Sequence, residues 1–187
     1  MAILAPAPIE CNPPTVQLFS RAELIPPDHG GIWRIERGAI RTVTWNEEGT
    51  PLTLGYWGVG DVVGHRLSRV QPYEIHCLTS VEASILPQEL WQQALATILL
   101  HAQQTQELLS IMHYQKVSQR LWQFLVFLSR KFGRDVQWGR LIDLPLTHQD
   151  IAEAINTTRV SVTRMLQHFE ALGKLRRSKR QLILFLG

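Results

Sequence analysis

At 187 residues the chain has room for one domain of moderate size or two small ones, and its 45% of hydrophobic residues is sufficient for packed cores. No apolar run approaches the roughly 20 residues of a membrane-spanning helix, so we expect a cytoplasmic protein without membrane contact. Residues 1–113 hold 6 Lys and Arg against 11 Asp and Glu (net −5) and residues 114–187 hold 13 against 5 (net +8), which predicts that the C-terminal part binds nucleic acid and the N-terminal part has another task.

The N-terminal half has the pattern of a small β domain. Residues 1–14 contain four prolines and no periodic pattern, which predicts a flexible leader without chemistry. From residue 16 to residue 86, short apolar runs alternate with glycine-containing turns, and residues 33–45 and 52–57 are typical of strands. Regular spacing of such strands predicts a β-barrel, roll or sandwich over residues 15–88.

A long helix is expected next, over residues 89–116. Residues 89–111 contain neither Gly nor Pro, and a heptad-like seam of apolar and small residues runs along them. A narrow stripe of this kind suits pairing with a second copy of the helix, so we predict a dimerisation helix; a core helix packed on its own domain is the alternative. The predicted seam consists of Leu95, Ile98, Ala102, Thr105, Leu109 and Met112.

The C-terminal part, residues 117–187, contains three further helical patterns. The first is predicted for residues 119–132, with Ser118 as its cap and Gly133 as its end. The second begins at Thr147, whose hydroxyl forms a capping box with Asp150, and closes near Asn156, a residue type that accepts the left-handed conformation. Two turns of helix followed by a tight polar turn indicate the first half of a helix-turn-helix.

The last helical pattern has the residues of a recognition helix. Thr157 or Thr158 is expected to cap it, and Gly173 to end it. An apolar stripe faces inward, whereas the outward face joins two arginines to small hydroxyl residues near the helix start, which suits entry into a DNA major groove. The basic segment that follows, with alternating apolar residues, predicts a strand pair that forms a wing beside the helix.

Specific roles on DNA follow from these positions. Arg159 and Arg164 are predicted to read bases, because a guanidinium donates two hydrogen bonds to guanine, and Val160 offers apolar contact to a thymine methyl group. Hydroxyl, imidazole and basic side chains at the helix starts and in the wing are expected to bind phosphates. The predicted phosphate-binding residues are Thr147, His148, Thr158, Ser161, Lys174, Arg176, Arg177 and Lys179.

The sequence resembles a known family at two places. Residues 146–166 read LTHQDIAEAINTTRVSVTRML, which is similar to the C-terminal signature of the Crp/Fnr family of bacterial transcription regulators, especially its cyanobacterial nitrogen-regulator branch. Residues 32–43 and 46–64 read IWRIERGAIRTV and NEEGTPLTLGYWGVGDVVG, which resemble the β-roll sensor of that family. The resemblance implies an α+β fold: a β-roll (cupin-like double-stranded β-helix), a dimerisation helix and a C-terminal winged helix-turn-helix.

The resemblance also implies a function. A homodimer would bind a near-palindromic operator, with RNA polymerase as a further partner and a small-molecule effector, still unnamed, in the sensor. His65 stands where cyclic-nucleotide-binding members carry Glu, and no Arg-Ser pair precedes the next strand, so we expect no response to cyclic nucleotides. Either the sensor gates DNA binding or it has lost its ligand and serves as a dimer scaffold.

Other classes of function find less support. The chain lacks a nucleophile elbow, a phosphate-binding glycine loop and an HExxH motif, so we predict neither an enzyme nor a bound metal or cofactor. Cys11 and Cys77 match no metal-binding or redox spacing and are expected to be free thiols, whose role stays open. The alternative is a small-molecule-binding module, for cyclic nucleotide or 2-oxoglutarate, whose helix-turn-helix contacts protein.

Overall fold

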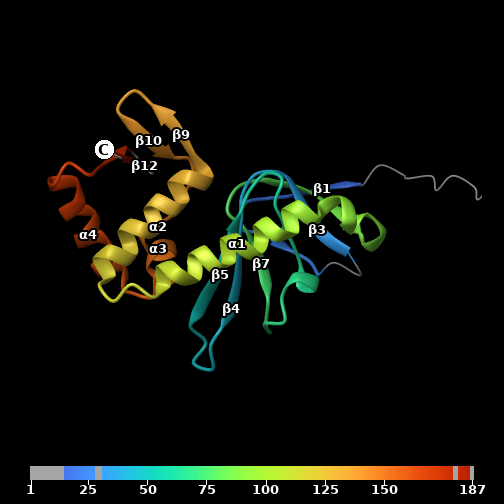
Figure 1. Ribbon diagram of the computed structural model, residues 1–187. Coiled ribbons are helices and arrows are strands. Elements are labelled where there is room, and N and C mark those ends of the chain that lie inside the picture. Colours follow the sequence, from blue (N-terminus) through green and yellow to red (C-terminus); the bar gives the residue numbers. More distant parts are fainter. Residues whose placement is uncertain (1–14, 28–30, 179–180, 186–187) are drawn as a thin grey trace, which may run out of the picture.

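The computed structural model describes residues 15–27, 31–178 and 181–185. A β-rich lobe from the N-terminal half lies beside a mainly helical lobe from the C-terminal half, and a long helix runs along the first lobe towards the second (Figure 1). The leader predicted for residues 1–14, which includes Cys11, lies outside the described residues, as do Lys179 and Arg180.

The described residues of the N-terminal lobe form eight strands, and the pairings among them are antiparallel. One sheet has the order β1-β8-β3-β6 and the other the order β2-β7-β4-β5, so each sheet joins strands that are distant in sequence. This arrangement confirms the predicted β-roll. The strands are β1 (Val16–Phe19), β2 (Leu24–Ile25), β3 (Gly31–Arg37), β4 (Ile40–Trp45), β5 (Pro51–Trp57), β6 (Val62–Val63), β7 (Glu74–Cys77) and β8 (Val81–Pro87).

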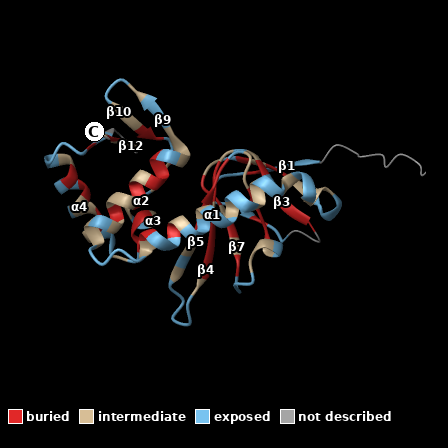
Figure 2. Ribbon diagram, viewed as in Figure 1, coloured by how far each residue is buried: buried red, intermediate tan, exposed pale blue. Residues whose placement is uncertain are grey.

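The space between the two sheets is filled by large apolar side chains. Alternate residues of a strand point to the same face, and in this way β3 contributes Trp33 and Ile35 to the core and β7 contributes Ile75 and Cys77. The Trp33 ring meets Phe19 edge to face, with the ring centres 5.7 Å apart. The buried segments of these strands are red in Figure 2.

The connection to the C-terminal lobe begins differently from the prediction. An α-helix is expected from residue 89, but a 3-10 helix, η2 (Gln88–Ala94), precedes the long helix α1 (Leu95–Met112). The N-cap residue Pro87 offers no side-chain acceptor, and the Trp91 indole donates to the Leu86 carbonyl at 3.1 Å. This bond draws the chain back towards β8, which favours the tighter 3-10 winding at a helix start.

The C-terminal lobe confirms the predicted winged helix-turn-helix. Its four-stranded sheet has the order β11-β12-β10-β9, in which the hairpin of β9 and β10 is an element not predicted from the sequence pattern. No helix in the described part of the chain has the length and apolarity to cross a membrane. The elements are α2 (Val117–Phe132), β9 (Gly133–Val136), β10 (Gly139–Ile142), α3 (His148–Ala154), α4 (Arg159–Ala171), β11 (Leu175–Ser178) and β12 (Gln181–Leu184).

One helix start in this lobe corrects the sequence interpretation. Ser118 is the expected cap, but Lys116 is the N-cap of α2 and Ser118 lies in the first turn. The Arg120 N–H already bonds to the Lys116 carbonyl at 3.0 Å, so the helical hydrogen bonds begin two residues earlier than predicted. The expected end at Gly133 is confirmed.

The two lobes share an apolar core as well as a connecting helix. Ala39, Tyr56 and Leu78 of the β-roll belong to the same buried cluster as the inward faces of α2, α3 and α4. The rings of Tyr56 and Phe124 have centres 5.6 Å apart across this junction. The C-terminal lobe is therefore packed directly against the β-roll of its own chain.

Candidate nucleic-acid interface and sensor cavity

The first helix of the helix-turn-helix, α3, is started by its own side chains. The Thr147 hydroxyl accepts from the Asp150 N–H at 3.1 Å, while the Asp150 carboxylate accepts from the Thr147 N–H at 2.7 Å. This is the predicted capping box, which satisfies two amide groups that the first turn leaves without helical partners. Ile151 and Ala152 fix the inward face of the helix by burial.

The turn between α3 and α4 follows from two polar residues. Asn156 has a φ of 50°, the left-handed conformation that ends α3 as predicted. Of the two threonines that are candidates for the next cap, Thr158 is the one used, because its side chain accepts from the Ser161 N–H at 3.1 Å. The Thr158 and Ser161 hydroxyl oxygens are also 2.9 Å apart, so two of the three predicted phosphate-binding hydroxyls lie at the start of α4.

Helix α4 separates a buried face from an exposed face that carries the predicted base-reading residues. Val162, Leu166 and Phe169 are buried against the lobe. Arg159, Val160 and Arg164 are exposed, and Val160 keeps 58% of its surface accessible. An exposed valine beside two arginines on an open helix face has the chemistry for contact with base edges, because guanidinium groups bond to guanine and an apolar side chain contacts a thymine methyl group.

His148 links the start of α3 to the recognition helix. Its Nδ1 lies 2.8 Å from the Thr163 hydroxyl, and that hydroxyl donates to the Arg159 carbonyl at 3.0 Å. Burial lowers the pKa of His148, and the nearby charges of Arg177 and Arg159 lower it further. The neutral imidazole is therefore favoured while no anion is bound, and an approaching phosphate would oppose the effect of the two guanidinium groups.

The wing holds its basic residues in different ways. Arg177 pairs with Glu170 of α4, with Nη2 and Oε2 2.6 Å apart, and this bonding lowers the pKa of the Glu170 carboxyl. Lys174 lies over the Trp122 ring, with Nζ 5.5 Å from the ring centre, and Arg176 is exposed without such a contact among the described residues. Lys179, also predicted to bind phosphate, lies outside the described residues.

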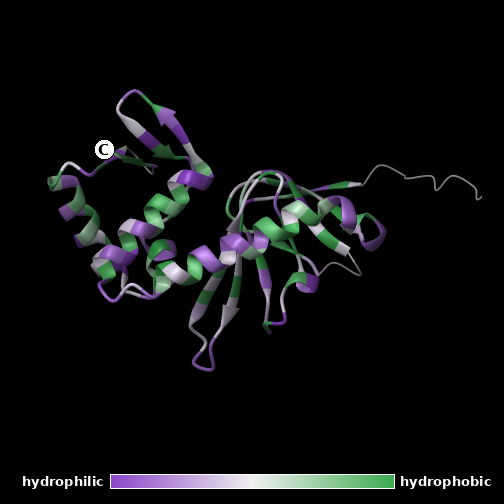
Figure 3. Ribbon diagram, in the orientation of Figure 1, coloured by the Kyte–Doolittle hydropathy of each residue, from purple (hydrophilic) through white to green (hydrophobic). Residues whose placement is uncertain are grey.

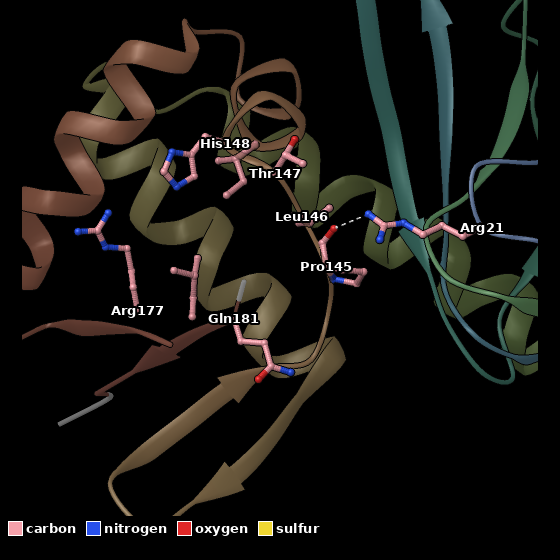
Figure 4. A pocket seen from close by; sticks show the side chains of 9 residues that line it. Arg21, Pro145, Leu146, Thr147, His148, Arg177 and Gln181 are labelled. Atoms are coloured by element: carbon pink, nitrogen blue, oxygen red, sulfur yellow. Dashed lines mark hydrogen bonds between the residues drawn. The ribbon is translucent and has the colours of Figure 1, made fainter. Parts of the chain in front are cut away.

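A cavity of about 300 Å³ brings three of the predicted phosphate-binding residues together (Figure 4). Thr147 and His148 from the start of α3 line one side, and Arg177 from β11 lines another. Arg21 reaches in from the β-roll and donates to the Pro145 carbonyl at 3.5 Å, the dashed line in Figure 4. Sequence reasoning missed Arg21, because no local signal connects it to residues 124 positions away.

A second cavity, of about 340 Å³, lies between the β-roll and α1. We call it the sensor cavity. Among the described residues that line it there is no Lys, Arg, Asp or Glu, and Arg66 and Arg69 in the adjoining segment do not reach it. Its lining residues are Thr42, Leu54, Trp57, Leu67, Ser68, Val70, Tyr73, His101, Ala102, Thr105 and Gln106. An anionic ligand would find no fixed counter-charge on this wall.

Helix α1 turns only part of its predicted seam outward. Leu95, Ala102 and Leu109 are exposed, and the two leucines keep 57% and 58% of their surface accessible. Ile98 and Met112 are half-buried, and Met112 packs against the core that the lobes share. Figure 3 shows apolar and polar segments alternating along this helix. Leu99, which is 56% exposed and is absent from the predicted seam, lies on the outward stripe instead of Ile98.

Known proteins similar to this chain are regulators. Residues 119–186 match the family described as the Crp-like helix-turn-helix domain. The chain is 37% identical over 169 residues to the Regulatory protein CysR of Synechococcus elongatus, with 89% of this chain and 82% of that protein covered. It is 33% identical over 178 residues to the Global nitrogen regulator of a Synechocystis species, with 84% and 78% covered. These names do not favour the alternative of a binding module that uses its helix-turn-helix for protein contact.

Solved structures share the fold at lower identity. A CRP-family transcriptional regulator from Thermus thermophilus superposes with a TM-score of 0.75 at 20% identity, covering 91% of this chain and 92% of that one. FixK2 from Bradyrhizobium japonicum gives a TM-score of 0.75 at 16% identity, with the same two coverages. The likeness concerns the order of β-roll, long helix and winged helix-turn-helix.

Proposed function

The chain belongs to the Crp/Fnr family of bacterial transcription regulators, and on that premise we propose that it binds a near-palindromic operator as a homodimer through α4. The observation that carries this proposal is the open face of α4, where Arg159, Val160 and Arg164 are exposed together on a winged helix-turn-helix. Two such helices in a dimer would enter successive major grooves of one duplex. No catalytic role is proposed.

The reading residues divide by chemistry. Arg159 and Arg164 would each donate two hydrogen bonds to guanine O6 and N7, which is worth about 1–3 kcal/mol of discrimination per base. The Val160 side chain forms no hydrogen bonds, so specificity at the base pair it faces would come from contact with a thymine methyl group. Position 160 thus sets a preference that a carboxylate in its place would not share.

Phosphate contacts would surround this reading face. Thr147, His148 and Arg177 line one cavity, and the Thr158 and Ser161 hydroxyls lie at the start of α4. Arg177 already has Glu170 as a partner, so we expect it to act on phosphate less than the exposed Arg176 does. The net charge of +8 over residues 114–187 supports a strong dependence of binding on salt.

Dimerisation would use the outward stripe of α1. Leu95, Leu99, Ala102 and Leu109 follow one another at intervals of four, three and seven residues, which is the spacing of a coiled-coil seam. Three exposed leucines on one stripe of a single helix favour a covering partner, and a second copy supplies an identical stripe. RNA polymerase is a further partner that activation of transcription would require.

The sensor cavity is proposed as an effector site that does not serve cyclic nucleotides. Its described wall is made of aromatic, aliphatic and hydroxyl side chains with the His101 imidazole and the Gln106 amide and has no Lys or Arg, so a phosphodiester would lose its hydration without a counter-charge. His65, in the short helix η1 (His65–Leu67), places its Nε2 3.1 Å from the Tyr73 carbonyl. An uncharged small molecule fits this chemistry better than an anion.

Selection from a randomised duplex library tests the proposal. The purified protein, without additives, is expected to select a two-fold symmetric site, and its affinity for that site is expected to fall steeply between two salt concentrations. Arg159→Ala and Arg164→Ala should each relax one guanine position, whereas Arg69→Ala, which removes an arginine of the β-roll, should change nothing. If no symmetric duplex is selected with or without a library of small metabolites, the DNA-binding proposal is wrong.

A further inference from the structure

A charged pair ties the C-terminal lobe to the β-roll at the end of α2. Lys131 Nζ lies 2.6 Å from Asp61 Oδ2, and the side chains are only 12% and 13% exposed. Asp61 also accepts from the Gly58 N–H at 2.7 Å, so the turn that carries it is held in place. Removing two charges from water is costly, and only good geometry with further hydrogen bonds offsets that cost. The position of α2 is therefore narrowly defined at this point.

Trp57 lines the sensor cavity and also lies beside Lys131 of the charged pair. Its indole stacks on His101 of α1, with ring centres 4.0 Å apart and an interplanar angle of 6°. Lys131 Nζ lies 5.3 Å from the centre of the same indole ring. Trp57 and His101 both line the sensor cavity. A molecule in the cavity and the Lys131 ammonium group would thus contact the same aromatic side chain.

Two glycines and one glutamine make this close approach possible. A Cβ at Gly55 would lie 2.2 Å from the Trp57 ring, and a Cβ at Gly58 would lie 2.9 Å from the Phe132 ring of α2. Gln104 of α1 donates to Asp61 Oδ1 at 3.4 Å and accepts from Lys131. The β-roll, α1 and α2 therefore meet at one polar cluster directly behind the cavity wall.

We propose that the Asp61–Lys131 pair is a latch that holds the C-terminal lobe in its operator-binding orientation, and that the sensor cavity acts on this latch through Trp57. This proposal rests on the proposed function and concerns how the sensor cavity controls operator binding. In the latched arrangement Arg159, Val160 and Arg164 are exposed, so docking leaves the reading face free. A lobe that is already oriented loses less freedom on binding DNA, and loss of the latch therefore weakens operator binding.

A double-mutant cycle in the full-length protein tests the latch. Asp61→Asn keeps an oxygen for the Gly58 N–H, and Lys131→Met keeps the aliphatic stem beside Trp57. Each single variant is expected to bind the selected operator about tenfold more weakly, and the double variant no more weakly than the weaker single one. Glu82→Gln, which breaks the exposed Arg37–Glu82 pair on the β-roll, serves as the matched control and should leave affinity unchanged.

Transmission from the sensor cavity to the latch is tested with a separate variant. Val70→Trp fills the sensor cavity from the loop before β7, and Val70 itself belongs neither to α1 nor to the DNA-binding lobe. It is expected to change operator affinity severalfold in the wild-type background and to have no further effect in the Lys131→Met background. An equal effect in both backgrounds, or none in either, would refute transmission through the latch.

Failures of the two proposals are distinguishable. If the wild-type protein selects no operator, the proposed function fails. If the wild-type protein selects one and the folded Asp61→Asn and Lys131→Met variants bind it equally well or more tightly, the latch alone fails. Hydrogen exchange in the last turn of α2 gives an independent readout, because loss of the latch should speed exchange there, and unchanged exchange in both variants would also overturn the inference.

Discussion

Arg41 on β4 offers the sharpest test of how the two lobes are held together. Its Nη1 lies 3.5 Å from Asp150 Oδ1 and 3.2 Å from Glu153 Oε2, both on α3. The three side chains are 15%, 23% and 21% exposed, so water screens them only partly. Arg41→Met keeps most of the aliphatic stem but leaves two neighbouring carboxylates without their cation.

The size of the effect follows from that partial burial. Exposed ion pairs contribute about 0.2–1 kcal/mol, whereas removal of one partner from a buried pair costs about 3–5 kcal/mol. The Arg41 network lies between these limits, so we expect a loss of about 2–3 kcal/mol in the free energy of unfolding. For a chain of this size each kcal/mol shifts the melting temperature by about 2–4 °C, which gives a decrease of about 4–12 °C.

Thermal unfolding followed by circular dichroism measures this decrease, and Arg37→Met is the matched control. Arg37 makes a single pair with Glu82 at 3.3 Å and its side chain is 77% exposed, so the same substitution there should shift the melting temperature by no more than about 4 °C. Equal shifts in the two variants would refute the reasoning, because they would mean that the contact with α3 adds nothing beyond an ordinary surface pair.

Two further predictions concern α1. Burial, the largest cause, lowers the pKa of His101 from its ordinary 6.5, so the unfolded chain takes up a proton at this residue at a higher pH than the folded chain does. The stability contributed by the neutral ring is present above about pH 6.5 and is lost as the pH falls below it. In denaturant titrations, His101→Gln should therefore reduce the decline of the free energy of unfolding between about pH 7 and 5 by at most about 1.4 kcal/mol per pH unit. An equally steep decline in the variant and the wild-type protein would contradict this. Leu99→Arg should leave only monomer in sedimentation experiments, whereas the wild-type chain and Leu100→Arg, which changes a neighbour that is 49% exposed and lies off the stripe, should sediment as the proposed dimer. Equal effects of the two substitutions would refute the assigned seam.

Local signals explain how much of the helix-turn-helix could be predicted from the sequence. The capping box of Thr147 and Asp150 acts over three residues, and the left-handed positions of Asn156 and Gly173 depend on their own backbones, with φ of 50° and 66°. Each of these preferences is fixed by side chains adjacent in the chain. The alternating strands of the β-roll were predictable for the same reason, because period-two burial is a local property.

The contacts between the lobes had no such signal. Arg41 meets Glu153 across 112 positions, and Asp61 meets Lys131 across 70, so neither pair leaves a pattern in a short window of sequence. The sequence marks Gly58 only as part of a turn. Gly58 matters because the Phe132 ring of α2 packs so closely against it that a Cβ there would lie 2.9 Å from the ring. Such positions become interpretable only when the neighbouring surface is known.

Helix α1 lies between these two cases, because its period was predictable but its rotation was not. The sequence carries two apolar stripes on this helix: Leu108 and Ile111 are buried against the chain's own lobes, and Leu95, Leu99 and Leu109 are exposed. A heptad count fits a seam through Ile98 about as well as one through Leu99. The rotation is set by distant partners, since His101 Nδ1 lies 2.9 Å from the Val62 carbonyl and Gln104 reaches Asp61. The β-roll therefore selects which stripe of α1 stays exposed, and His101 and Gln104 lie on the face turned away from that stripe.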